Sequence, residues 1–174
     1  MLMLMAAETM LFTTLLGGYV VLRGARGVWP PPGQPRLPLA ITWINTAILF
    51  ASCATMVQAW RGLRRRDAVS VRLALIQTTI LGTAFVGIQG SEWVRLVAHG
   101  LTLQAGVYGA TFYTLVGLHG LHVLGAVIWL VCLAWRCRPN RFSLARLAPL
   151  DICALYWFYV CGLWAVLFPA LYLM

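Results

Sequence analysis

The sequence predicts an all-α fold, a polytopic membrane bundle with five transmembrane helices. Of its 174 residues, 61% are apolar and only 10% are charged, whereas about a quarter of the residues in a soluble domain are charged. The mean hydropathy is +0.84. A helix that is apolar all round exposes no unsatisfied backbone groups and is therefore stable in lipid. Composition alone places the chain in a membrane.

Five apolar segments reach the roughly 20 residues that cross a bilayer. We expect them at about residues 1–22, 39–60, 71–98, 107–135 and 150–174, so that residues 1–174 form a single transmembrane domain. The first residues, MLMLMAAE, lack the positive region of a secretory signal and are interpreted as part of the first helix.

The connections and breaks follow from local chemistry. The first span is followed by RGARGVWPPPGQPRLP, whose five prolines exclude a continuing helix; we interpret this loop as interfacial, with Trp29 as an anchor. The third span contains Gly82, Gly87 and Gly90, which are expected to permit close helix contact. Pro169 is expected to kink or end the last helix.

The arginines predict the orientation. All 13 basic residues are Arg, and the excess of basic residues in short loops marks the inner side of a membrane. Nine lie on the side of the N-terminus, against four opposite: Arg61, Arg64, Arg65, Arg66, Arg72, Arg136, Arg138, Arg141 and Arg146, against Arg23, Arg26, Arg36 and Arg95. We therefore expect the N-terminus inside and the C-terminus outside. Because these charges lie between apolar runs, nucleic acid is not an expected partner.

Glu8 is the most informative candidate for a function. It lies about a third of the way along the first span, where an ionisable side chain costs at least about 2.5 kcal/mol unless it is paired or wetted. This depth predicts a proton-linked or a protonated structural role. The alternative is that the span begins later and that Glu8 lies at the headgroups.

His119 and His122 occur three residues apart in GLHGLHV, so both are expected to face the same side of the fourth span. Such a pair could ligate a metal, but the sequence arranges no further ligands beside it. We favour hydrogen bonding to neighbouring helices or to lipid headgroups, and we expect no metal site. The five cysteines include no C-x-x-C pair and predict neither a disulfide framework nor a zinc site.

Four further polar residues lie near span ends. In GIQGSEWVRL, Gln89 and Glu92 are one turn apart and Arg95 follows three residues later, so Glu92 and Arg95 can form an ion pair. This group is either an interfacial pair or a specific contact with lipid or a partner. Asp151 opens the fifth span, where a negative charge is favoured at the helix N-terminus. No nucleotide-binding motif and no catalytic constellation is present, so no catalytic residue is expected.

Six motifs in order resemble subunit III of the haem-copper oxidases, the cytochrome c oxidase subunit III family, in its five-helix bacterial form. They are AAETMLFTTLLGGYVVLRG, VWPPPG, ITWINTAILFAS, LGTAFVGIQGSEW, GVYGATFYTLVGLHGLHVLGA and LYWFYVCGLWAVLFPALYL. The resemblance covers essentially the whole chain. Phe158 and Cys161 depart from it, since the family pattern resembles W-Y-W-H-F-V-D-x-x-W, with His and Asp at these two positions.

The resemblance implies an accessory subunit of a proton-translocating cytochrome c or quinol oxidase in the bacterial plasma (inner) membrane. Such a subunit has no haem or copper of its own. It packs against catalytic subunit I, with subunit II in the same complex, and supports stability, lipid binding, oxygen access and proton uptake. Phospholipid is the expected bound molecule. Glu8 corresponds to the acid that faces the lipid cleft, and the residues implied in lipid or subunit contact are Gln89, Glu92, Arg95, His119, His122, Asp151 and Trp157.

Three alternatives remain open from the sequence. Within the superfamily, the chain also resembles the subunit-III-like accessory protein of nitric oxide reductases. From another class, it would be a small membrane carrier with Glu8 as its proton-coupled site, which requires a hydrated polar path. The third is a haem-binding membrane enzyme that uses His119 or His122 as a ligand.

Overall fold

The computed structural model describes residues 1–26, 29, 31, 37–136 and 148–173. Across these residues it is all-helical, and five helices are long and apolar enough to cross a membrane. The helices are α1 (Leu2–Gly24), α2 (Leu39–Arg64), α3 (Ala68–Ala98), α4 (Val107–Arg136) and α5 (Ala148–Phe168), followed by the π-helical turn η3 (Pro169–Leu173). The predicted fold class is confirmed. Arg36, Cys137, Arg138, Arg141, Arg146, Met174 and most of the VWPPPG motif lie outside the described residues.

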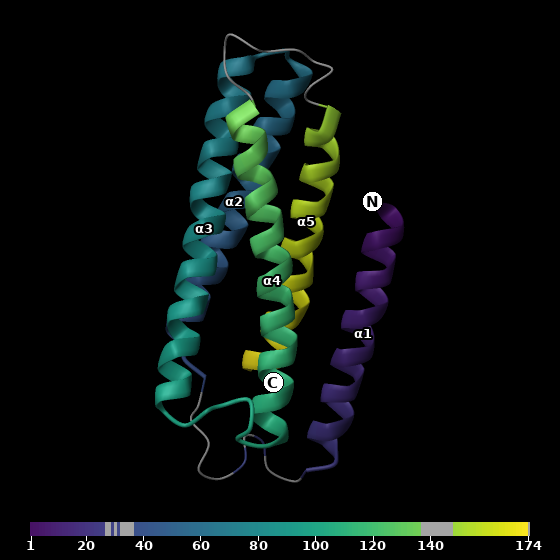
Figure 1. Ribbon diagram of the computed structural model, residues 1–174, viewed down its shortest axis with the longest axis vertical. Helices are drawn as coiled ribbons and strands as arrows, with labels where there is room; N and C mark the ends of the chain where they lie inside the picture. Colours follow the sequence, from purple (N-terminus) through teal and green to yellow (C-terminus); the bar gives the residue numbers. More distant parts are fainter. Residues whose placement is uncertain (27–28, 30, 32–36, 137–147, 174) are drawn as a thin grey trace.

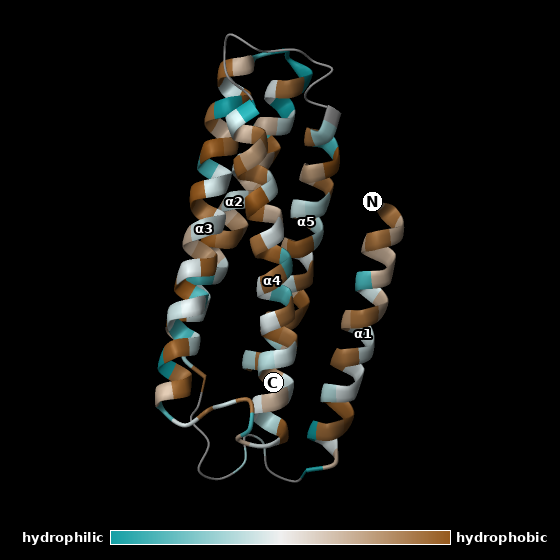
Figure 2. Ribbon diagram, in the orientation of Figure 1, coloured by the Kyte–Doolittle hydropathy of each residue, from teal (hydrophilic) through white to brown (hydrophobic). Residues whose placement is uncertain are grey.

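The five helices run alternately in opposite directions, and α1 lies at one side of the bundle that α2 to α5 form (Figure 1). It packs against α4 and α5. Apolar residues cover much of the outer helix surfaces, whereas hydrophilic residues gather near the turn between α2 and α3 (Figure 2). This distribution is the one expected of a bundle whose surface faces lipid or another membrane chain.

The turn between α2 and α3 is built by local hydrogen bonds. The amide of Asp67 donates to the Gly62 carbonyl at 3.0 Å, and that of Arg66 donates to Leu63 at 3.1 Å, which is the Schellman pattern of a helix end. Arg66 takes the left-handed conformation that this pattern requires, with φ at 60°. Asp67 then caps α3 by accepting from the amides of Val69 and Ser70, each at 3.1 Å. Helix α3 therefore begins at Ala68, three residues before the expected span.

Close packing in the bundle depends on Gly82. A Cβ added there would lie 2.5 Å from the Trp157 ring and 3.0 Å from Val127, so α3 approaches α4 and α5 only because this side chain is absent. The same role was expected of Gly87 and Gly90, and for these two it is wrong: an added Cβ meets no described atom within 4 Å at either position. Both face away from the bundle core.

The last helix ends as expected. Helix α5 stops at Phe168 and Pro169 begins η3, because a proline has no amide hydrogen to continue the α-helical ladder. The turn buries Tyr172, whose ring lies against Trp164 and Phe112. At the same end of the bundle, Trp29 packs edge-on between Tyr19 and Tyr108, with ring centroids 5.7 and 5.2 Å away.

Candidate functional site

Glu8 lies at the seam between α1 and the rest of the bundle. Its side chain is 8% exposed. The Tyr156 hydroxyl of α5 donates to Glu8 Oε1 at 3.2 Å, and His122 Nε2 of α4 lies 3.5 Å from the same oxygen. Phe12, one turn further along α1, covers the His122 ring edge-on with centroids 5.5 Å apart. Three helices thus converge on one carboxyl group. We call the three residues that meet here, Glu8, His122 and Tyr156, the Glu8 seam site.

The hydrogen bonds of His122 determine what this site can do chemically. His122 Nδ1 is 2.6 Å from the carbonyl oxygen of Leu118, which only accepts, so Nδ1 carries a proton. In a neutral imidazole the second nitrogen, Nε2, then has a bare lone pair, which a carboxylate oxygen repels. The contact with Glu8 is attractive only if a further proton sits on Glu8 or on Nε2. The geometry therefore suits a site that holds one exchangeable proton.

His119 lies in a different environment from His122. It is 1% exposed, stacks on Trp164 with centroids 5.2 Å apart and meets Phe85 edge-on at 6.4 Å. Neither ring nitrogen has a hydrogen-bond partner among the described residues. A three-residue step leaves the two side chains about 60° apart around α4, yet they meet different helices: His119 lies against α3 and α5, whereas His122 lies against α1. The shared face that the sequence predicts therefore does not become a shared site.

Within the described residues, no three His, Cys, Asp or Glu side chains gather as a metal site would require. The cysteines described are Cys53, Cys132, Cys153 and Cys161, and all four are free.

Gln89 belongs to a polar chain that crosses the bundle. The Asn45 side-chain amide donates to the Phe85 carbonyl at 3.2 Å and to Gln89 Oε1 at 3.3 Å, and Gln89 Nε2 donates to the Tyr172 hydroxyl at 3.2 Å. The chain therefore joins α2, α3 and η3. Sequence reasoning missed Asn45 and Tyr172, although an Asn within an apolar span was a usable signal for the first.

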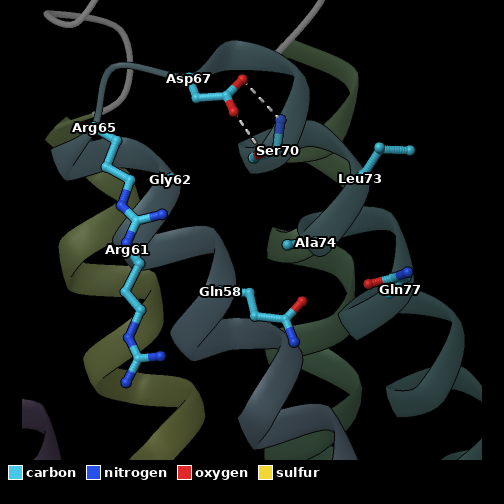
Figure 3. A pocket seen from close by; sticks show the side chains of 9 residues that line it. All are labelled: Gln58, Arg61, Gly62, Arg65, Asp67, Ser70, Leu73, Ala74 and Gln77. Carbon is cyan, nitrogen blue, oxygen red and sulfur yellow. Dashed lines mark hydrogen bonds between the residues drawn. The ribbon is translucent and has the colours of Figure 1, made fainter.

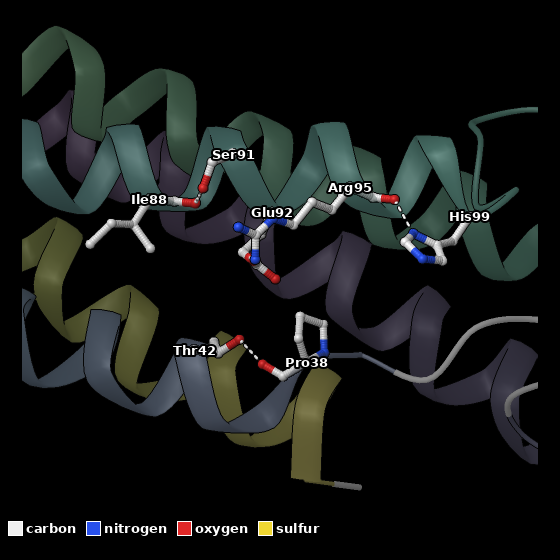
Figure 4. A network of polar contacts seen from close by, with 7 residues as sticks. All are labelled: Pro38, Thr42, Ile88, Ser91, Glu92, Arg95 and His99. Carbon is white, nitrogen blue, oxygen red and sulfur yellow. Dashed lines mark hydrogen bonds and ion pairs between the residues drawn. The ribbon is translucent and has the colours of Figure 1, made fainter.

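The predicted ion pair between Glu92 and Arg95 is confirmed, with Arg95 Nη1 3.2 Å from Glu92 Oε1. The carboxylate is 6% exposed and the guanidinium side chain 68%, so the pair runs from the bundle interior to its surface. Figure 4 shows the Glu92 side chain directed from α3 toward the start of α2, where Thr42 donates to the Pro38 carbonyl at 2.7 Å. His99 Nδ1 bonds to the Arg95 carbonyl at 2.7 Å.

Asp151 lies in the first turn of α5, as predicted. It also accepts a hydrogen bond from the Trp60 indole of α2 at 2.9 Å, which the sequence did not indicate. Trp157 is fully buried and donates to Ser52 Oγ at 3.2 Å, so its direct contacts lie inside this chain. Of the two positions that depart from the family pattern, Phe158 is exposed and Cys161 is buried.

Comparison with known proteins agrees with this architecture. The chain is a multi-pass membrane protein whose helices enclose one buried seam carboxyl and one buried ion-paired carboxylate. The family model described as cytochrome c oxidase subunit III matches residues 1–174. The chain therefore belongs to the cytochrome c oxidase subunit III family, and the resemblance seen in the motifs is confirmed.

Several curated relatives are similar over nearly the whole chain. A probable cytochrome c oxidase subunit 3 of Nocardia farcinica is 34% identical over 170 residues, which cover 97% of this chain and 83% of the relative. The corresponding protein of Mycobacterium leprae is 32% identical over 169 residues, with the same two coverages. The cytochrome c oxidase subunit 3 of Synechocystis is 30% identical over 171 residues, 98% of this chain and 72% of the relative.

Proposed function

We propose that this chain is the accessory subunit III of a haem-copper terminal oxidase and supports the catalytic subunit without a redox centre of its own. The observation that carries the proposal is the family match along the entire chain. The proposed setting is the bacterial plasma membrane, with the N-terminus inside, as the arginine distribution favours. Subunits I and II are the proposed partners.

The surface of the chain supports a place in a larger complex. Large apolar side chains are exposed on several helices, among them Met3 at 89%, Met10 at 72% and Val94 at 70%. In a membrane such surfaces are covered by lipid tails or by another apolar chain. Apolar walls and lipid tails also dissolve oxygen better than water does, which suits a subunit that supports oxygen access to a buried centre elsewhere.

The Glu8 seam site is proposed as a proton-linked group of this subunit. Its geometry favours one exchangeable proton between Glu8 and His122, and Tyr156 orients the carboxyl oxygen that they share. We propose that this proton supports uptake by the catalytic subunit. Lipid or subunit contact is proposed for the exposed side chains of Arg95 and Asp151, with Gln89, Glu92, His119, His122 and Trp157 acting from within the bundle.

The alternatives are not favoured. The relatives reported above are named as subunits of cytochrome c oxidase rather than of a nitric oxide reductase. A carrier would need a polar path leading to Glu8, yet the contacts of this carboxyl group among the described residues are Tyr156 and His122 alone.

The assembly is tested by purifying the tagged chain from its native membrane in mild detergent. We expect a catalytic subunit with a tyrosine-histidine copper site to co-purify, and the haem absorbance to follow that subunit. A partner with a non-haem iron site would instead identify a nitric oxide reductase. A stoichiometric Soret band from the isolated chain would overturn the accessory role.

Exchange of Glu8 for Gln tests the proton-linked role in the assembled complex. Glu8→Gln keeps an oxygen that accepts from Tyr156 but cannot pass a proton to His122, so we expect normal assembly and a shorter turnover lifetime or altered proton uptake. Thr14→Ala, at an exposed residue of α1 whose hydroxyl donates to the Met10 carbonyl of the same helix, is the matched control and should behave as wild type. An identical turnover record for Glu8→Gln and wild type would contradict this role.

A further inference from the structure

A polar groove lies between α2 and α3 at the end where these helices are joined (Figure 3). It encloses about 410 Å³, within the range of ligand sites, and is called here the hairpin groove. Its lining residues are Gln58, Arg61, Gly62, Arg65, Asp67, Ser70, Leu73, Ala74 and Gln77. Residues spaced by three and four on each helix share one face, so the two helices each present one stripe to the groove.

The arginines of the groove have no anionic partner among the described residues. The protein has four side-chain carboxylates, all of them among the described residues and all engaged elsewhere. Glu8 meets Tyr156, Glu92 meets Arg95, and Asp151 meets Trp60. Asp67 lines the groove but is turned to the start of α3, where it also accepts from the Ser70 hydroxyl at 2.5 Å. In the described part of the chain no carboxylate lies within 4 Å of Arg61 or Arg65, and both side chains are exposed.

Two amides continue the polar lining toward the middle of the membrane span. Gln58 is three residues before Arg61, which is about 4.5 Å along the helix, and Gln77 lies at the corresponding depth on α3. Both are exposed, and neither side chain has a hydrogen-bond partner among the described residues. An amide that faces hydrocarbon without a partner costs several kcal/mol. A ligand with acceptors at this depth would remove that cost.

From this juxtaposition we propose that the hairpin groove binds one anionic glycerophospholipid. The phosphate accepts from Arg61 and Arg65, and the ester carbonyls below it accept from the amides of Gln58 and Gln77. The acyl chains then run past Gln77 along the exposed Ile80, which lies deeper on the same stripe of α3. The inference rests on the proposed lipid-binding function and gives it a location and a headgroup chemistry.

The charge of the surrounding surface selects an anionic headgroup over a zwitterionic one. At this end of the bundle the described arginines outnumber the carboxylates Asp67 and Asp151, and these arginines are Arg61, Arg64, Arg65, Arg66, Arg72 and Arg136. Basic pockets between helices on the inner side of a membrane bind anionic headgroups for this reason.

The test is native mass spectrometry of the whole complex after equilibration with phosphatidylglycerol or phosphatidylcholine of matched acyl chains. We expect the wild-type complex to retain one more lipid molecule after equilibration with phosphatidylglycerol than after equilibration with phosphatidylcholine. Arg61→Gln and Arg65→Gln should each weaken this retention about fivefold, the factor that corresponds to about 1 kcal/mol for each arginine near a membrane surface. Arg64→Gln is the matched control, because Arg64 lies 3.9 Å over the Trp60 ring and does not line the groove.

A second pair of variants separates a lipid from a free anion. Gln58→Leu and Gln77→Leu should weaken retention of phosphatidylglycerol while leaving the effect of added inorganic phosphate unchanged, because free phosphate has no ester carbonyls. Full displacement of the lipid by inorganic phosphate would overturn the proposal in favour of a simple anion site. Equal losses in Arg64→Gln and in the groove variants would overturn it as non-specific surface charge.

The same spectra show whether the groove binds a protein instead of a lipid. They also show whether the proposed oxidase role fails. If the groove variants lose the catalytic subunit but keep their phosphatidylglycerol, the groove is a protein interface and the lipid proposal is wrong. If no catalytic subunit accompanies wild type at all, the proposed oxidase role fails, whereas the lipid count of the tagged chain still tests the groove.

Discussion

Helix α1 and the bundle of α2 to α5 are held in different ways. In the most apolar stretch of α1, 17% of the residues are buried inside the chain. In the corresponding stretch of the last span, Pro149–Leu173, which consists of α5 and η3, the buried share is 50%. The buried residues of α1 are Glu8, Phe12 and Tyr19, which follow one stripe of the helix. The bundle is instead closed by tryptophans and a close approach at Gly82. Polar contacts therefore contribute a larger share of the attachment of α1.

This difference shows where a partner can act. A helix that is mostly exposed within its own chain requires lipid or a second chain around it, and small changes at its seam can shift its position without unfolding the bundle. The Glu8 seam site, for which a proton-linked role is proposed, lies at that seam. A subunit built in this way can respond at α1 while α2 to α5 remain packed.

The largest expected effect comes from adding one methyl group at Gly82 in the bundle, which we compare with the same addition at Gly17 in α1. Gly82→Ala places a Cβ 2.5 Å from the Trp157 ring, and we expect it to lower the free energy of unfolding by about 1–3 kcal/mol through overpacking. Gly17→Ala in α1 meets no described atom within 4 Å and should be neutral or slightly stabilising, since alanine favours a helix over glycine. Unfolding in mixed micelles measures both. Equal losses in the two variants would remove the proposed distinction between the regions.

An intermediate effect is expected from removing one tyrosine hydroxyl at the seam. Tyr156→Phe deletes the donor to Glu8, and the loss of a hydrogen bond worth about 1 kcal/mol should speed amide exchange in α1 about fivefold. Exchange in α2 to α4 should not change. Tyr172→Phe, which deletes the partner of Gln89, is the matched control and should act on η3 and α3 instead. Faster exchange throughout the molecule in Tyr156→Phe would show that α1 and the bundle open together.

The smallest effect is expected at the turn between α2 and α3, where only the start of α3 responds. Hydrogen bonds from the Ser70 hydroxyl and amide hold the pKa of Asp67 below its usual value of 3.8. A lowered folded-state pKa contributes stability that is present above 3.8 and is lost as the pH falls through the folded value. The amides of Val69 and Ser70 should therefore lose protection only in strong acid. Asp67→Ala should abolish this pH dependence, and loss of protection already near neutral pH in wild type would contradict it.

Much of the fold could be read locally. A span is recognised from its length and hydropathy, because lipid forces each backbone segment to satisfy its own hydrogen bonds. The break at Pro169, the position of Asp151 in the first turn of α5 and the Glu92–Arg95 pair are local for the same reason: each involves residues within about one helical turn. The motifs that carry the family resemblance are likewise contiguous stretches of sequence.

The sequence by itself thus determined the five helices and the family, and it singled out Glu8 as a buried acid. Only the tertiary structure decided that Glu8 meets His122 rather than His119, and that Gln58 and Gln77 share a groove with Arg61 and Arg65. These contacts join residues far apart in the chain. They depend on how each helix is rotated about its axis, and that rotation is set by packing, such as Trp157 against Gly82, rather than by any local pattern.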